Sequence, residues 1–238
     1  MKVKDILARV VTLYNDEDYV RVTQEGYLKF LDDAINQVIL SRPDAHVKTS
    51  IVKLTTGTRQ RLPEDGYSLI DIYSNKIPDP VAGYLPGTPV FQVDRKDLDY
   101  FSNWHGTNTN PTEITEFAYD LRSPRTYWVS PAVGTNEIYV EMDYSYGVTP
   151  FSGTDFATAL EQDIPLAEVF RGPLVSYMLY LLYSTDSTSS NDLQVAQRYE
   201  ASFYQALGLE YKATFYVVPK IEGASVAGVP TTPTPAQP

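Results

Sequence analysis

The feature that most constrains this chain is a nearly continuous apolar segment, Gly172-Pro-Leu-Val-Ser-Tyr-Met-Leu-Tyr-Leu-Leu-Tyr-Ser184. From Leu174 to Tyr183 the run holds 10 residues, of which one is a serine. A helix that spans a membrane needs about 20 consecutive apolar residues. We therefore expect no membrane span here but a short helix that is buried on most faces, in a core or in an interface.

The charge balance narrows the possible partners. The chain carries 30 acidic and 19 basic residues, a net charge of −11, which argues against affinity for the phosphates of DNA. It has no cysteine, so disulfides, thiolate zinc sites and cysteine nucleophiles are excluded. The first residues, MKVKDILARVV, mix charged with apolar side chains and lack the continuous apolar region of a signal peptide.

Helical spacing predicts two helices at the start of the chain. Apolar side chains recur at this spacing over residues 3–14. After a polar break, Thr23 is placed to cap a second helix, with Glu25 in its first turn, and Pro43 ends it. Such a pair usually forms an antiparallel hairpin. The apolar stripe of the second helix contains Leu28, Leu31, Ile35, Val38 and Ile39.

The pattern then changes to alternation, which is typical of strands. The clearest case is residues 136–146, where Ile138, Val140, Met142, Tyr144 and Tyr146 share one face. Residues 76–89 hold four prolines and two glycines and are predicted to be a loop, and residues 94–101 a short helix capped by Asp94. The strands are predicted at 47–54, 59–63, 67–74, 90–93, 114–120, 126–130 and 136–146.

Helical patterns return in the last third of the chain. Asp163 before Ile164-Pro165 indicates a helix start, Gly172-Pro173 restarts the chain into the apolar segment, and a last helix covers residues 193–207. Residues 219–238 contain five prolines and are expected to be extended or disordered on their own.

The predicted fold class is α+β. The N- and C-terminal helix pairs form one helical bundle, an antiparallel β region is inserted between them, and an extended tail follows. The bundle is assigned residues 1–45 and 160–212, the inserted β-rich domain residues 46–159, and the proline-rich tail residues 213–238.

A search for catalytic chemistry yields no site. His46 and His105 are isolated and are interpreted as structural; residue order leaves a Ser-His-Asp triad open, but no G-x-S-x-G elbow supports it. Nucleotide-binding glycine motifs are absent from the sequence. The acidic clusters at 16–18, 32–33 and 94–99 do not follow a calcium-loop pattern and are interpreted as solvated surface. We therefore predict no enzyme, no cofactor and no metal.

Aromatic residues leave two alternatives open. Trp104 with His105, and Trp128 with Tyr127, could form a platform on which sugars stack, or they could pack between β elements. The 19 tyrosines suit interfaces, but β-sheets favour tyrosine as well.

Several stretches, taken in order, resemble the head-to-tail adaptor (connector) proteins of tailed bacteriophages. The resemblance covers most of residues 3–210 and rests on the ordered series rather than on one motif. The stretches are NDEDYVRVTQEGYLKFLDDAINQVILSRPDA (15–45), GTRQRLPEDG (57–66), NWHG followed by PTEITEFAYD, SPRTYWVSPAVGTNEIYVEMDYS (123–145), DIPLAEVFRGPLVSYMLYLLYSTD and AQRYEASFYQALG.

This resemblance implies a non-catalytic structural protein of the virion neck, between capsid and tail, that assembles in the host cytoplasm. Related adaptors form rings, commonly of twelve copies, beneath the portal protein, and the genomic DNA passes through the lumen. The implied partners are the portal protein, a tail tube or nozzle protein, and further copies of the chain. An acidic ring agrees with this, because like charge gives DNA no counterion release on contact.

In such rings the C-terminal segment often reaches the portal. We expect the portal contact at Tyr211, Phe215, Tyr216, Val217 and Val218; the alternative is a final helical turn packed on the bundle. Free protein is expected to be monomeric until a partner templates the ring. The rival hypotheses are a virion carbohydrate-binding module that uses Trp104, His105 and Trp128, and a hydrolase of cell-wall sugar, for which no acid/base pair is evident.

Overall fold

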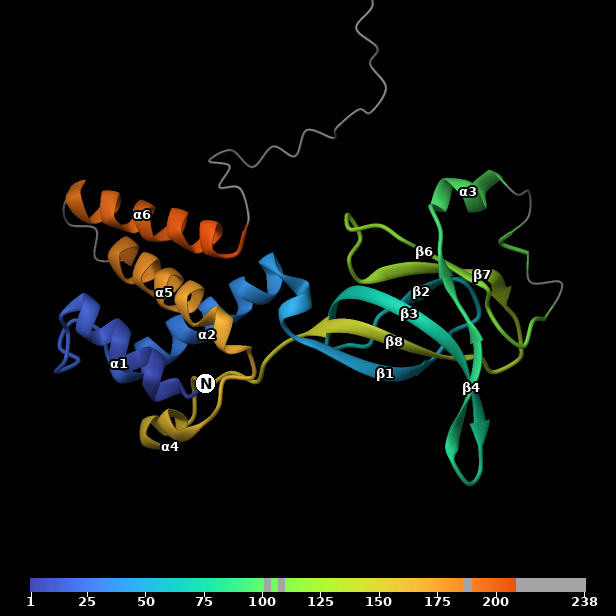
Figure 1. Ribbon diagram of the computed structural model, residues 1–238, viewed down its shortest axis with the longest axis horizontal. Helices are drawn as coiled ribbons and strands as arrows, with labels where there is room; N and C mark the ends of the chain where they lie inside the picture. The colour runs from blue at the N-terminus through green and yellow to red at the C-terminus, as the bar shows by residue number, and fades with distance from the viewer. Residues whose placement is uncertain (101–103, 107–109, 186–189, 209–238) are drawn as a thin grey trace, which may run out of the picture.

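The computed structural model describes residues 1–100, 104–106, 110–185 and 190–208. Most helices gather at one end of an elongated molecule, and the strands lie at the other end together with the short helix α3, Arg95–Tyr100 (Figure 1). The predicted α+β class is confirmed. The proline-rich tail lies outside the described residues.

Two amphipathic helices open the chain, as predicted. Helix α1 spans Val3–Tyr14 and α2 spans Gln24–Ser41. Thr23 caps α2, since its Oγ1 accepts the backbone N–H of Gly26 at 3.2 Å. The single-turn 3-10 helix η1, Pro43–Ala45, follows α2. Each helix buries one apolar stripe, because apolar residues three and four positions apart share a helix face.

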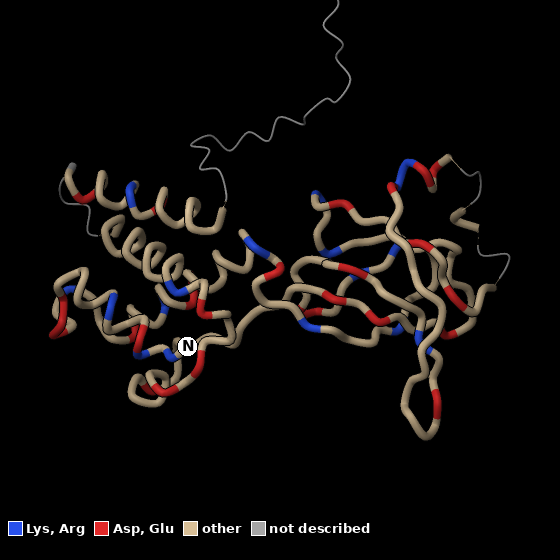
Figure 2. Tube along the Cα trace, viewed as in Figure 1, with Lys and Arg blue, Asp and Glu red and all other residues tan. Residues whose placement is uncertain are grey.

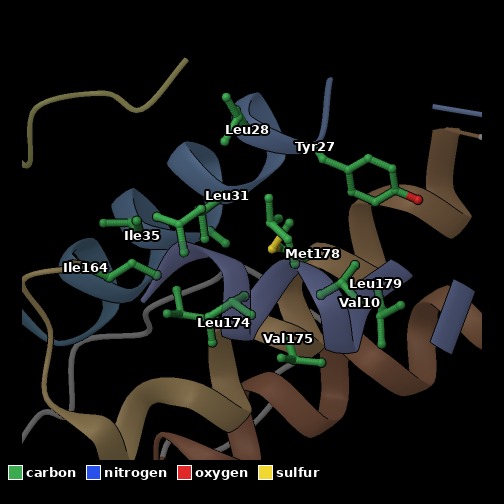
Figure 3. Packing of buried hydrophobic residues seen from close by; sticks show 14 of the residues in the cluster. Val10, Tyr27, Leu28, Leu31, Ile35, Ile164, Leu174, Val175, Met178 and Leu179 are labelled. Atoms are coloured by element: carbon green, nitrogen blue, oxygen red, sulfur yellow. The ribbon is translucent and has the colours of Figure 1, made fainter. Parts of the chain in front are cut away.

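The apolar segment forms α5, Arg171–Thr185, which lies in the middle of the helices. It packs against α1 and α2 on one side and against α6, Ser190–Ala206, on the other. Figure 3 shows Leu174, Met178 and Leu179 facing side chains of α1 and α2. A helix between two layers is apolar on nearly every side, which explains the composition of this segment. Its buried residues are Pro173, Leu174, Val175, Met178, Leu179 and Leu182.

One of the two predictions for this region is wrong. No helix begins at Asp163, because residues 162–164 pair in extended form with the first residues of the chain: the N–H of Val3 donates to the oxygen of Gln162 at 3.1 Å, and that of Ile164 to Met1 at 2.8 Å. The predicted restart at Gly172-Pro173 agrees with the structure, because both residues lie in the first turn of α5, where the N–H that proline lacks would have no helical partner.

The helices share one continuous apolar core with the segment that returns from the strands. This segment contains α4, Phe156–Glu161, and the 3-10 helix η2, Glu168–Phe170. Phe151 and Ala159, which precede residue 160, are buried in the same core as α1, α2 and α5. The division of the chain into domains stays a prediction.

In the described part of the chain, the strands form two four-stranded sheets. The first has the order β1 (Val47–Lys53), β8 (Tyr139–Tyr146), β3 (Gly66–Asp79) and β4 (Gly83–Pro89), all antiparallel. The second has the order β2 (Gly57–Arg61), β7 (Thr126–Val133), β6 (Glu116–Tyr119) and β5 (Phe91–Gln92). The predicted antiparallel arrangement needs one correction, because β5 pairs with β6 in parallel.

Side chains from both sheets form a second apolar core. Ile72 and Met142 come from the first sheet, and Phe117 and Val129 from the second. The predicted alternation of β8 is confirmed, because Ile138, Val140, Met142 and Tyr144 are buried and Tyr146 packs partly against the same core.

Residues 76–89 are not a loop. They form the end of β3 and all of β4, a hairpin in which Pro78 lies opposite Tyr84 and Pro86 opposite Lys76. Pro86 and Pro89 are tolerated because β4 is the edge strand of its sheet, where half of the N–H groups need no ladder partner. Pro78 is tolerated because it lies beyond Lys76, where the pairing of β3 with β8 ends. Proline content alone therefore misled the prediction.

Replacement of Leu179 by alanine should lower the free energy of unfolding by about 2–5 kcal/mol, because the side chain is fully buried between helix layers and its removal leaves a cavity. Leu193→Ala on α6 is the matched control: this leucine is 51% exposed, and we expect a change within about 0.5 kcal/mol. Urea unfolding followed by circular dichroism measures both. Equal effects for the two variants would show that α5 is not the centre of the core.

Candidate interaction surfaces

The acidic cluster at 16–18 organises the loop between α1 and α2. Asp16 is 4% exposed, which contradicts the predicted solvated surface for this residue. Its Oδ1 accepts the backbone N–H groups of Val20 and Arg21 at 2.8 and 3.0 Å, and its Oδ2 accepts that of Val22 and the hydroxyl of Tyr27, both at 3.1 Å. The carboxylate thereby closes a loop that would otherwise leave these donors unpaired.

Burial would raise the pKa of Asp16, but the N–H groups of Arg21, Val22 and Val20 and the Tyr27 hydroxyl outweigh it and hold this pKa below its usual value. The carboxylate therefore stays charged at neutral pH. Its neighbours Glu17 and Asp18 are exposed, as predicted.

The other two acidic clusters also make internal contacts. Asp32 on α2 accepts the N–H groups of Phe151 and Ser152 at 2.8 and 2.9 Å and so fastens the segment that returns from the strands, whereas Asp33 is exposed. Asp94 caps α3, Arg95–Tyr100, through the N–H of Lys96 at 2.9 Å, as predicted.

Across the described residues, no group of three or more metal-ligating side chains comes together. The acidic clusters are therefore explained by loop and helix contacts.

Trp128 and Tyr127 do not form the exposed sugar platform that the sequence left open, because both are buried. Trp128 is 9% exposed, and the guanidinium carbon of Arg95 lies 4.2 Å from its ring centre. Trp104 donates its Nε1–H to Asp99 at 3.1 Å, and its ring lies 3.8 Å from that of His105. These side chains pack a small satellite core under α3, so the packing alternative holds for Trp128.

Both histidines have structural contacts, as predicted. The Nδ1 of His46 lies 3.0 Å from the carbonyl oxygen of Tyr146, and the two rings stack with 4.0 Å between their centres. The Nδ1 of His105 lies 2.7 Å from the hydroxyl of Thr58. Neither contact supplies the carboxylate and hydroxyl pair of a hydrolytic triad.

The tyrosines serve the cores as well as the surface. Tyr14 and Tyr27 are fully buried among the helices, and Tyr127 and Tyr144 among the strands. Tyr100, in contrast, is 91% exposed. Tyrosine content therefore does not by itself indicate an interface.

The outer face of the first sheet carries an ordered polar network. Asp143 accepts the hydroxyl of Thr49 at 2.6 Å and that of Tyr73 at 2.7 Å, so one carboxylate joins β1, β8 and β3. The hydrogen bond to this carboxylate raises the pKa of Tyr73 to about 12, and the tyrosine stays protonated at neutral pH. Lys76 and Glu141 form an ion pair at 2.9 Å on the same face.

The most exposed apolar surface of the strands is the end of the β3–β4 hairpin. Pairing between β3 and β8 ends at Lys76, and residues 77–85 continue as two strands alone. Figure 1 shows this arm, residues 77–85, projecting beyond the sheet. Its exposed apolar side chains are Ile77, Val81, Tyr84 and Leu85, and Val81 is 95% exposed.

The end of α6 is fixed beside the junction of helices and strands. Arg42, which follows α2, donates from Nη1 to the carbonyl oxygen of Leu207 at 3.2 Å and pairs with Asp44 at 2.7 Å. A cation at a helix C-terminus also interacts favourably with the helix dipole. The predicted portal contacts follow directly after this point, but Tyr211, Phe215, Tyr216, Val217 and Val218 lie outside the described residues.

Comparison with known families decides what kind of protein this is. The family model named SU10 adaptor protein matches residues 1–224, which includes the helical core, both sheets and the segment 211–218. The chain belongs to the SU10 adaptor protein family. No curated protein matches it.

Membership makes the chain a structural adaptor protein of a bacteriophage, a component of the virion that interacts with other virion components. The predicted resemblance to phage adaptors is thereby confirmed. Within the described part of this adaptor, no helix has the length and apolar character to cross a membrane.

Replacement of Asp16 by asparagine should lower the free energy of unfolding of the adaptor by about 1–3 kcal/mol at pH 7, because the amide keeps one acceptor oxygen but replaces the other with an NH2 group, so the donors paired with that oxygen lose their acceptor. The exposed neighbour offers the control Asp18→Asn, for which we expect a change within about 0.5 kcal/mol. Chemical unfolding at a series of pH values is the measurement.

The pH dependence of the Asp16 effect has a fixed sign. The folded pKa of Asp16 is depressed, so its stabilisation is fully present above the unfolded value of about 3.9 and is lost as the pH falls through the lower folded pKa. The difference between wild type and Asp16→Asn should persist at pH 5 and shrink below about pH 4. A difference that grew towards acid pH would contradict this assignment.

Proposed function

We propose that this SU10 adaptor joins the portal protein of the phage to its tail, as a ring of twelve copies in the virion neck. The genomic DNA passes through the lumen of the ring without sequence-specific binding. The observation that carries the proposal is the family match over residues 1–224, which covers both ends of the elongated molecule. In this proposal the ring assembles in the host cytoplasm from free monomers.

The shape supports a connecting role. The chain has one apolar core among the helices and another among the strands, and they lie at opposite ends of the long axis (Figure 1). Two ends with cores of their own can bind two different neighbours without sharing a surface. We propose that the helical bundle, residues 1–45 and 160–212, builds the wall of the ring, and that the β domain, residues 46–159, faces the tail tube or nozzle protein.

The charge supports a passage for DNA. Acidic side chains occur at both ends of the molecule (Figure 2), and the chain carries a net charge of −11. A wall built from such subunits releases no counterions from DNA phosphates and therefore does not retain the genome. The proposed function accordingly needs no catalytic residue.

The segment after α6 is proposed to bind the portal. Arg42 fixes the end of α6 at the junction of helices and strands, and the chain beyond Gly208 continues from there. Tyr211, Phe215, Tyr216, Val217 and Val218 supply the aromatic and apolar groups that protein interfaces favour. Residues 211–238, which begin with these contacts and include the proline-rich tail 213–238, order themselves against the portal on assembly in this proposal.

Deletion of residues 211–238 should leave a folded protein that no longer binds portal rings. Folding should survive because the described core ends at Leu207, so the deletion removes none of its buried side chains. Deletion of residues 219–238 alone is the matched control and should retain binding, since it keeps the five contact residues. Co-sedimentation of each variant with purified portal rings measures binding, and circular dichroism measures folding.

Two results would overturn this assignment. Portal binding that survives the longer deletion would place the contact elsewhere. A longer deletion that lowers the stability of the monomer would mean that residues 211–218 form a last turn packed on the helical bundle.

A further inference from the structure

The arm, residues 77–85, has the features of a docking element. A two-stranded ribbon in water is marginally stable on its own, and this one exposes Ile77, Val81, Tyr84 and Leu85 beyond the support of β8. Clustered apolar side chains on a projecting element indicate a surface for another macromolecule.

The tip of the arm is preformed. The Oδ1 atom of Asp79 accepts the backbone N–H groups of Val81 and Ala82 at 2.9 and 2.7 Å, which fixes the turn. Gly83 closes the turn with a φ of +77°, a left-handed conformation that glycine adopts at low cost. A rigid tip loses little conformational entropy when it binds.

The charge of the arm points to another copy of this chain as its partner. Asp79 is the only charged residue between 77 and 85, and Figure 2 shows the arm almost free of charge. Nucleic acid is excluded as a partner because the arm has no basic residue. Copies of a chain with a net charge of −11 repel each other, so contacts between them favour surfaces that lack carboxylates.

A recess of matching chemistry lies at the junction of helices and strands. It has a volume of about 350 Å³, and its apolar lining includes Tyr146, Val148, Phe151 and Pro165. Among the described residues that line it, Asp163 is the only acidic or basic one apart from His46.

Three other hollows of the described surface suit the arm less well. Insertion of the arm into any of them would desolvate ionised groups, which is unfavourable in free energy. The one beside α1 contains Asp5, Arg9 and Arg171, and the one at the root of the arm contains Lys76, Glu113 and Glu137. The largest, beside α3, is lined by seven charged residues: Asp44, Asp94, Arg95, Lys96, Asp99, Asp120 and Arg122.

We propose that the tip of the arm inserts into the junction recess of the next copy around the ring. Within one copy the two surfaces lie well apart along the long axis (Figure 1), so the contact joins different copies. A contact between two unlike surfaces is head-to-tail and closes into a ring when its rotation permits. This inference rests on the proposed ring and adds which surfaces hold neighbouring copies together.

Cysteine cross-linking tests the contact cleanly, because the chain has no cysteine of its own. The variant with Val81→Cys and Thr149→Cys places one thiol on the tip and one on the recess, both at exposed positions. Phage particles that carry it should yield, after mild oxidation, a ladder of covalent oligomers on a non-reducing gel. The matched control pairs Val81→Cys with Ala8→Cys in the hollow beside α1 and should remain monomeric.

A charge substitution tests the same contact independently. Val81→Asp should lower incorporation of the chain into particles more than about tenfold, because it would bury a carboxylate without a partner. Leu121→Asp is the control: Leu121 is 77% exposed in the turn between β6 and β7, and this variant should be incorporated normally. Circular dichroism of both free proteins verifies folding.

The outcomes separate the two proposals. Suppose that particles contain the wild-type chain, that the variant with Val81→Cys and Thr149→Cys gives no ladder, and that Val81→Asp is incorporated normally. These results together would overturn the arm contact and leave the proposed function standing. Purified particles that lack the wild-type chain overturn the proposed function, and the arm contact fails with it.

Discussion

Burial of α5 between two helix layers is the constraint on which the rest of the structure depends. Its side chains Leu174, Met178, Leu179 and Leu182 have no exposed surface, so α1 and α2 must lie on one side and α6 on the other. Residues from both ends of the chain therefore belong to one core. The strands are consequently held as a projection from that core, and the junction between the two parts takes its position from contacts such as Asp32 with Phe151 and Arg42 with Leu207.

The sequence predicted this core well because helical periodicity reports burial directly. The apolar stripe predicted for α2 is buried throughout, although Tyr27 and Ala34 are buried as well, and Val140, Met142 and Tyr144 of β8 are buried as predicted. The errors arose where a local signal competed with a distant partner. Asp163-Ile164-Pro165 carries a helix-start signal, but backbone pairing with the first residues of the chain holds it extended. The prolines of β4 indicate a loop, but their position at a sheet edge permits a strand.

The surfaces were harder to predict than the core. Asp16 was indistinguishable in the sequence from its exposed neighbours Glu17 and Asp18, because its burial depends on a loop that its own carboxylate organises. The arm was not predicted from the sequence, because its apolar residues lie among prolines, which indicate a loop. Trp128 was correctly predicted to lie in a strand. Its contact with Arg95 could not be predicted, because Arg95 lies on a separate helix. The spacing of apolar residues thus predicts which residues face a core. Prediction of exposed sites requires the positions of several segments that are distant in the sequence.

The order in which the helices are synthesised leaves part of the helical core exposed during translation. The apolar stripes of α1 and α2 are complete at residue 41, but α5, which covers them, begins at Arg171. At typical synthesis rates the intervening 129 residues take on the order of 10 s to appear. Throughout that interval the nascent chain exposes the apolar surface that α5 later covers. Such a surface favours binding of chaperones until α5 has been synthesised.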